Sequence, residues 1–210
     1  MRHIYRSLML LVTLLGCSTV PVPRGLRPVS VVRPAAADAT SALDELLRND
    51  LSGDHSFPWS AARPLTWNDF QAAPPTEGRE GAKTSYSLYS VWKCRGAVFE
   101  FRVIAGFRTR RSWVKLVVLN DSVQRRTVLG HEQTHFDLGE LYARRMRQAF
   151  AALSAPCRKS DAALSALVQR IADEEKAEQR RYDAETHHGL LAAPQVAWSL
   201  QTRRRLTASR

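Results

Sequence analysis

Residues 122–153 read SVQRRTVLGHEQTHFDLGELYARRMRQAFAAL. Apolar residues and two histidines recur in this stretch at steps of three and four, which is the period of one helix face. The members of this series are Val128, His131, His135, Leu138, Tyr142, Met146, Ala149 and Leu153. The pattern predicts one long helix, which Asn120 or Asp121 can cap and Pro156 ends.

A second helix is expected after it, from Ser160 until Gly189 offers a C-cap. Its buried face is predicted from residues at the same spacing, namely Leu164, Leu167, Val168, Ile171, Glu178 and Tyr182. Before the first helix, three stretches rich in aromatic and β-branched residues predict an antiparallel meander. These stretches are Thr84–Trp92, Ala97–Ala105 and Ser112–Leu119. The predicted fold class is therefore α+β, with an antiparallel β-sheet packed against two long helices.

The first 17 residues have the outline of a bacterial lipoprotein signal peptide. Arg2 and Arg6 precede an apolar run that ends in Leu14-Leu15-Gly16-Cys17, which is similar to a lipobox. Cys17 is therefore the expected site of lipid attachment to the membrane. An ordinary signal peptide cleaved beyond Thr19 is the alternative, and both alternatives predict an exported protein.

The remaining chain divides into three further segments by composition. Residues 18–40 contain four prolines and are expected to form a tether. Residues 41–193 are expected to form one folded domain, with a short helix at its start, over 41–51. Residues 194–210 contain Arg203, Arg204 and Arg205 and are expected to be an exposed basic tail.

Composition limits the function classes. The chain has 210 residues and a formal net charge of +11, a surplus that attracts anionic lipid or acidic polymers. Export argues against a nucleic-acid partner, so none is predicted. Cys94 and Cys157 are the two cysteines besides Cys17, and an oxidising compartment favours a disulfide between them, with two separate buried thiols as the alternative. The oligomeric state is not predicted.

The residues His131-Glu132-Gln133-Thr134-His135 form an HExxH motif within the helical pattern. Two histidines four residues apart lie on one helix face and can bind one Zn²⁺ ion. Glu132 is then the expected general base, which takes a proton as water attacks a carbonyl group. The alternative is a pair of buried core histidines, but each imidazole would then need its own partner.

Three stretches together resemble a family of predicted secreted bacterial zinc-dependent proteases, catalogued as a domain of unknown function (DUF922). They are Leu65–Phe70 (LTWNDF), Leu129–Asp137 (LGHEQTHFD) with Glu140 beyond it, and Tyr182–Gly189 (YDAETHHG). The resemblance implies a zincin-like metallopeptidase fold in which the third stretch completes the metal site. It implies no particular substrate.

A catalytic zinc needs a third protein ligand. His188 matches the histidine of the resembled family and is the first choice. Asp183 is the second, either as a ligand or as a residue that orients one of the histidines. Glu185 and Glu140 follow. Glu174, Glu175 and Glu178 are expected to be solvated charges of the helix.

Tyr182 is a candidate donor to a developing oxyanion, although a core tyrosine is the favoured interpretation. A basic cluster in the strand region is expected on a solvated face of the sheet, with orientation of the domain near an anionic membrane or glycan as the alternative. Its members are Arg102, Arg108, Arg110, Arg111 and Lys115. The predicted activity is hydrolysis of peptide bonds in a peptide or protein substrate. Two alternatives stay open: an amidase that acts on cell-wall peptide, and a noncatalytic envelope lipoprotein with a zinc site.

Overall fold

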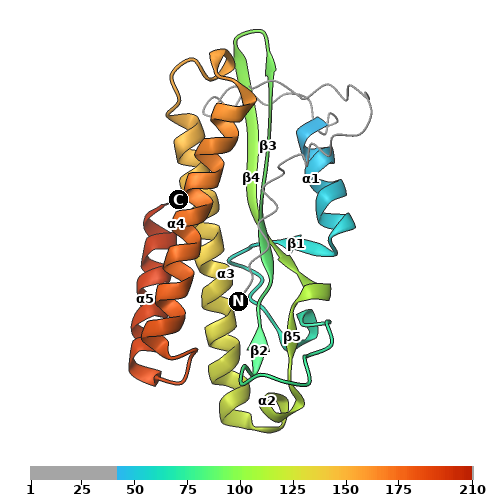
Figure 1. The fold of residues 1–210 in the computed structure, drawn as a ribbon, viewed down its shortest axis with the longest axis vertical. Helices are drawn as coiled ribbons and strands as arrows, with labels where there is room; N and C mark the ends of the chain where they lie inside the picture. Colours follow the sequence, from blue (N-terminus) through green and yellow to red (C-terminus); the bar gives the residue numbers. More distant parts are fainter. Residues whose placement is uncertain (1–41, 210) are drawn as a thin grey trace.

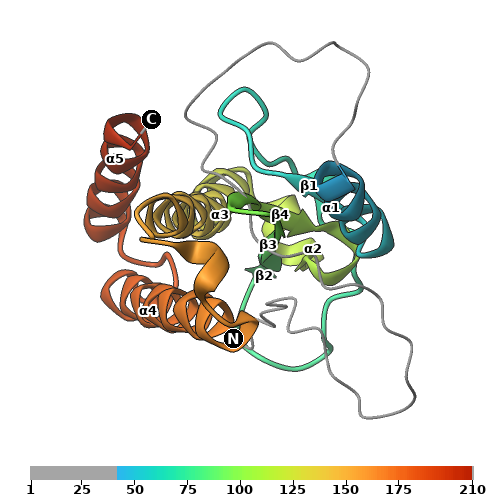
Figure 2. The same ribbon diagram turned by 90° about the horizontal axis from the view of Figure 1, so that it is seen from above.

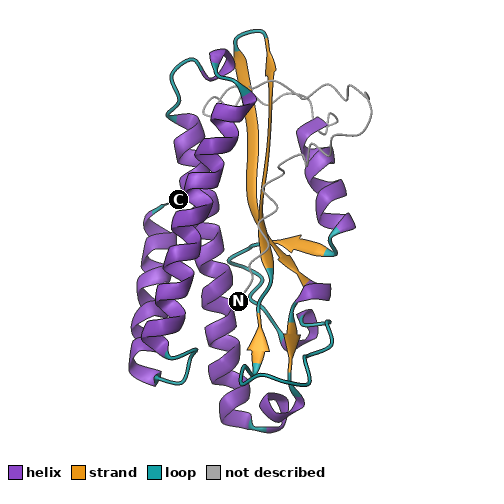
Figure 3. Cartoon of the chain, in the orientation of Figure 1, coloured by secondary structure: helices purple, strands orange, loops and turns teal. Residues whose placement is uncertain are grey.

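The computed structural model describes residues 42–209, which form an α+β arrangement (Figures 1 and 3). Its helices are α1 (Ala42–Gly53), α2 (Leu116–Asn120), α3 (Ser122–Ala151), α4 (Asp161–Thr186) and α5 (Ala192–Ala208). Its strands are β1 (Ser56–Pro58), β2 (Ala82–Lys83), β3 (Tyr86–Arg95), β4 (Val98–Arg108) and β5 (Trp113–Val114). Short 3-10 helices lie at Trp67–Asp69 (η1), Thr109–Arg111 (η2) and Pro156–Arg158 (η3). The signal segment, the tether and Cys17 lie outside the described residues.

A long antiparallel hairpin of β3 and β4 dominates the sheet, as the sequence predicts. Its register runs from Tyr86 opposite Phe107 to Arg95 opposite Val98, and Gly96 occupies the turn with a φ of 59°. On the other edge of β4, β1 pairs antiparallel, with Ser56 opposite Arg108. The resulting order is β1-β4-β3.

The predicted third strand over residues 112–119 is wrong. Only Trp113–Val114 is extended, and it pairs with β2 in a separate two-stranded sheet. Residues 116–120 form α2 instead, and Leu116 and Val117 are exposed to solvent. A short apolar run does not by itself distinguish a strand from a helix, which explains the error.

The hairpin lies between α1 on one side and α3 on the other, and α4 and α5 lie against α3 (Figure 2). Aromatic side chains join the hairpin to α3: the Phe99 and Phe150 rings are 5.6 Å apart, and those of Phe107 and Phe136 are 5.5 Å apart. Arg108, which we expected on a solvated face, is buried and pairs with Asp54 at 3.2 Å. No helix within residues 42–209 combines the length and apolar character that a membrane span requires.

The two long helices begin where their capping residues predict. Asp121 accepts hydrogen bonds from the backbone N–H groups of Val123 and Gln124, at 2.8 and 2.9 Å, and thus caps α3. Ser160 caps α4 by accepting a hydrogen bond from the Ala163 N–H at 3.2 Å. These three bonds satisfy amide groups that the first turn of a helix leaves without partners.

The prediction of an exposed tail after residue 193 is wrong, because this segment forms α5. Its inward face is built from Gln195, Trp198, Thr202 and Leu206, all of them buried at steps of three and four. One of the arginines that suggested a tail, Arg205, forms an ion pair with Glu178 of α4. The helical layer therefore has three long helices, not two.

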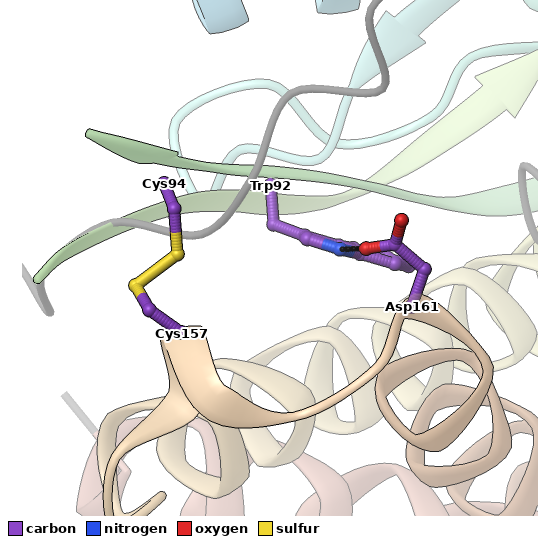
Figure 4. The surroundings of a disulfide bond; sticks show 4 residues. All are labelled: Trp92, Cys94, Cys157 and Asp161. Carbon is purple, nitrogen blue, oxygen red and sulfur yellow. Dashed lines mark hydrogen bonds between the residues drawn. A yellow bond between two sulfur atoms is a disulfide. The ribbon is translucent and has the colours of Figure 1, made fainter. Parts of the chain in front are cut away.

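The disulfide between Cys94 and Cys157 is confirmed (Figure 4). It joins the end of β3 to η3, in the connection between α3 and α4, with a Cα–Cα distance of 6.0 Å. Beside it, the Trp92 indole N–H donates to the Asp161 carboxylate at 3.3 Å. Since disulfides persist in oxidising compartments, this bond indicates that the folded protein is located outside the cytoplasm.

Candidate metal centre

His131 and His135 lie one turn apart on the inner face of α3, and both side chains are buried. Their Nε2 atoms are 3.1 Å apart, and the two rings are nearly perpendicular, with centroids 4.6 Å apart. The two Nε2 atoms therefore converge on one point, as the motif predicts.

Asp183 of α4 supplies a third donor atom at the same point. Its Oδ1 lies 3.3 Å from Nε2 of His131 and 3.0 Å from Nε2 of His135. Within the described residues, these three side chains form a group that could hold a metal ion, and all three are buried. Ligand atoms around a tetrahedral zinc ion stand about 3.3 Å apart, so the triangle has the dimensions of three zinc ligands.

The outward nitrogens of both rings face acceptor atoms. Nδ1 of His135 lies 2.5 Å from Oε1 of Gln179, and Nδ1 of His131 lies 3.0 Å from Oε1 of Gln195. An amide oxygen only accepts, so each Nδ1 carries the proton and each Nε2 presents a lone pair. In the neutral form of both rings, two lone pairs and the Asp183 carboxylate oxygen meet at one point. A cation at this point relieves the repulsion, so the residues present fit a metal ion.

The pKa directions show the same preference for positive charge. Burial alone would raise the pKa of Asp183, but His131 and His135 hold it well below its ordinary value. Burial alone would lower the pKa of His135, but the Asp183 carboxylate raises it above its ordinary value. The electrostatic field at the meeting point thus favours a cation.

Glu132 follows His131 directly in α3, is buried and has a fixed orientation. Its Oε2 accepts a hydrogen bond of 2.6 Å from the backbone N–H of Thr84, between β2 and β3. The hydroxyl of Thr84 donates in turn to the backbone carbonyl of Glu132 at 3.2 Å. The carboxylate is therefore held at the boundary between α3 and the sheet.

Tyr182 is a fully buried residue that packs on the centre. Its ring stacks on His131, with centroids 4.8 Å apart, and its hydroxyl donates to Oε1 of Gln195 at 2.8 Å. Burial raises the pKa of this hydroxyl well above its ordinary value. These contacts agree with the favoured interpretation of a core tyrosine.

His188 does not join the three converging donors. Its side chain is 60% exposed, and its Nδ1 lies 3.7 Å from Oδ1 of Asp183. The other carboxylates considered as ligands have different partners: Glu185 accepts from the Trp198 indole, and Glu140 pairs with Arg144 and Arg147.

The expectation that Glu175 is solvated is wrong. Its side chain is buried and accepts a hydrogen bond from the Tyr86 hydroxyl. Glu178 is also largely enclosed, because it accepts from Tyr142 and pairs with Arg205. Glu174 agrees better with the expectation, since it forms a surface ion pair with Arg145.

A left-handed turn closes α4 over the centre. His187, His188 and Gly189 have φ angles of 46°, 56° and 83° in succession. A Cβ atom on Gly189 would stand 2.9 Å from Cγ of His131, so this position needs a glycine for space as well as for its backbone angle. The turn therefore packs directly on a ring of the candidate metal centre.

Sequence reasoning missed Gln179 and Gln195. Gln179 lies one turn before Asp183 on the same face of α4. This four-residue spacing could have indicated that Gln179 also faces the two histidines. Gln195 lies in the segment expected to be an exposed tail. No local pattern distinguishes its amide from a surface one.

Comparison with known families gives one match to this centre. Residues 105–189 match a family described as "Bacterial protein of unknown function (DUF922)". The DUF922 match includes the HExxH motif, Asp183 and the turn at Gly189, but it excludes the LTWNDF stretch and all of α5. No curated protein and no solved structure matches the chain significantly. The similarity to zincins therefore stays a prediction.

Proposed function

We propose that this chain is a zinc-dependent peptidase of the bacterial cell envelope, in which His131, His135 and Asp183 hold the metal. The observation that carries the proposal is the convergence of Nε2 of His131, Nε2 of His135 and Oδ1 of Asp183 within 3.0–3.3 Å of one another. Imidazole nitrogen and carboxylate oxygen are ordinary zinc ligands, and three protein ligands are typical of catalytic zinc sites.

Zinc bound at these three atoms would supply a Lewis acid that polarises a carbonyl group and makes water more acidic. Glu132 would act as general base; the proposal is supported by its position directly after His131 in the HExxH motif and by the burial of its side chain. The N–H of Thr84 binds one of its oxygens, which fixes the orientation of the carboxylate. Glu132 would accept the proton of the attacking water and pass it to the leaving amine.

A peptide or protein substrate is supported by the HExxH motif and by the resemblance described above. The Cys94–Cys157 disulfide supports an exported protein. We further propose that Cys17 carries a lipid that anchors the chain to the membrane. Metabolic labelling with a tritiated fatty acid tests this, since wild type would be labelled and Cys17→Ser would not; an unlabelled wild type would contradict it.

A structural, noncatalytic metal site is the second candidate. It is supported by the burial of all three donors and by the position of His188, which is 3.7 Å from Asp183 and is a potential fourth ligand. A closed site with four protein ligands has a structural role, whereas an open position permits catalysis. X-ray absorption of the zinc-loaded chain distinguishes these two by the number of imidazole ligands.

The decisive experiment measures metal content and cleavage of unfolded casein in wild type, Glu132→Gln and Glu174→Gln. We expect one zinc per chain in all three and a loss of cleavage of about a hundredfold or more in Glu132→Gln alone, because that variant lacks the base. Glu174 carries a surface carboxylate of the same kind and serves as the control. Unchanged cleavage in Glu132→Gln would contradict the mechanism, and zinc without any cleavage would favour the structural site.

A further inference from the structure

Each ring nitrogen that faces away from the metal position meets a glutamine from a different helix. Gln179 of α4 meets His135, and Gln195 of α5 meets His131. Both glutamine side chains are buried among helices α3, α4 and α5. Buried amides are costly unless their polar atoms are bonded, so two of them at matching positions call for a physical explanation.

We infer that Gln179 and Gln195 are the positioning residues of the metal centre, and that α5 belongs to this centre through Gln195. The inference rests on the proposed zinc site and adds to it the residues that set the protonation and direction of both rings. Such partners of metal-bound histidines typically change metal affinity by 10- to 100-fold when they are removed.

The direction of the Gln179 amide is fixed by its other bonds. Its Nε2 donates to the backbone carbonyl of His135 at 3.0 Å and to the hydroxyl of Tyr86. A backbone carbonyl only accepts, so the NH₂ group must face it and Oε1 must face the ring. Gln179 thus holds His135 by its ring and its backbone at once.

The Gln195 amide is oriented in a similar way. Its Nε2 donates to the Ser199 hydroxyl at 3.2 Å, while its Oε1 accepts from Tyr182 at 2.8 Å. Ser199 lies within 2.9 Å of the Thr134 hydroxyl, which links α5 back to α3. The amide oxygen therefore stays directed at His131.

The chemical consequence concerns the inward nitrogens. With a proton held on each Nδ1, each Nε2 keeps a free lone pair for the metal. Without the amide acceptor, a ring can carry its proton on Nε2 or rotate, and both changes must be reversed before it binds a metal.

The first test needs no substitution. Long-range ¹H–¹⁵N correlation spectra of the metal-free, full-length chain, recorded at a pH of about 9, identify the ring nitrogens that carry a proton. We expect the Nδ1–H form for both His131 and His135. An Nε2–H form at either ring would overturn the inference, whether or not the chain binds zinc.

The second test compares apolar and acceptor replacements of similar size. Gln195→Met and Gln179→Met remove the acceptor, Gln195→Glu and Gln179→Glu keep it, and Gln201→Met alters an exposed residue of α5 as the control. We expect the zinc dissociation constant, from chelator competition, to rise about 10- to 100-fold in the Met variants and to rise by no more than about threefold in the others. The visible spectrum of the Co²⁺ form would change in the Met variants alone.

Wild-type zinc affinity in both Met variants would overturn the inference and leave the proposed metal site intact. Failure of the wild-type chain to bind zinc would instead overturn the proposed function. Thermal melting of each metal-free variant shows which variants fold. If a Met variant does not fold, the ¹H–¹⁵N spectra of the wild-type rings test the inference on their own.

Discussion

Gly189 lies so close to His131 that a single added carbon would collide with the imidazole, at 2.9 Å from Cγ and 3.1 Å from Cβ. The backbone of Gly189 also has a φ of 83°, which side chains with a Cβ rarely adopt. The end of α4 and a predicted metal ligand on α3 therefore constrain one another.

Gly189→Ala is expected to displace the His131 ring and lower zinc affinity by about tenfold, with a loss of about 1–3 kcal/mol in stability from overpacking and strain. Gly78→Ala is the matched control, because Gly78 has a φ of 98° and no atom within 4 Å of the added carbon. Titration with zinc and urea unfolding measure the two effects. An equal zinc affinity in both variants would contradict the proposed contact.

Asp183 and His188 are distinguished by substitution. Asp183→Asn removes the negative charge at nearly constant volume, so we expect zinc affinity to fall by about a hundredfold or more. His188→Ala is expected to keep one zinc per chain, since His188 is largely exposed and stands 3.7 Å from Asp183. Metal analysis after dialysis checks both; loss of zinc in His188→Ala with retention in Asp183→Asn would reverse the ligand assignment.

The disulfide predicts a large change in stability. Cys94 and Cys157 are 63 residues apart in the sequence, and a crosslink over such a loop restricts the unfolded chain by about 3–4 kcal/mol. The double variant Cys94→Ala/Cys157→Ala is therefore expected to have a free energy of unfolding, measured by urea titration, that is lower by this amount, with zinc affinity unchanged. A loss below about 1 kcal/mol would show that the bond contributes little to the fold.

Glu175 predicts a pH dependence of stability. Burial raises its pKa from 4.5 to about 8, so the folded state keeps this carboxyl group protonated at neutral pH. Below about pH 4.5 both states are protonated, and between the two pKa values only the unfolded state ionises. Stability then falls as pH rises, by up to about 1.4 kcal/mol per pH unit, and levels off above the folded pKa.

Glu175→Gln is expected to remove this slope, because a glutamine amide stays neutral at every pH. Urea unfolding of wild type and variant in chelator, from pH 5 to 9, isolates the contribution of Glu175 as the difference between the two curves. Glu174→Gln, at the neighbouring surface position, is expected to follow wild type. Parallel curves for Glu175→Gln and wild type would contradict the raised pKa.

The parts of the fold with strong periodicity were predictable from the sequence. The stripe from Val128 to Leu153 predicted α3, and Asp121 and Ser160 cap their helices as their residue types indicate. The hairpin was predicted from β-branched and aromatic runs on either side of Gly96. In these segments the local preference and the tertiary burial agree.

The parts that were not predicted depend on tertiary contacts. α5 is rich in arginine, and only its packing on α3 and α4 shows that Trp198 and Leu206 are core residues. Asp183, and not His188, converges with His131 and His135. This depends on how the last turn of α4 faces α3, and residue spacing alone does not predict it. The burial of Glu175 also depends on a tertiary contact, because the Tyr86 hydroxyl that donates to it belongs to β3, 89 positions earlier in the chain.

The contribution of α5 has a consequence for biogenesis. His131 of α3 and Gln195 of α5, which contacts its ring, are separated by 64 positions in the sequence. A nascent chain that has not yet been synthesised past Gln195 therefore holds an incompletely oriented ligand set, whatever metal ions surround it. Assembly of the proposed centre must therefore wait until α5 has been synthesised and packed on α3, which separates metal capture in time from synthesis of the HExxH segment.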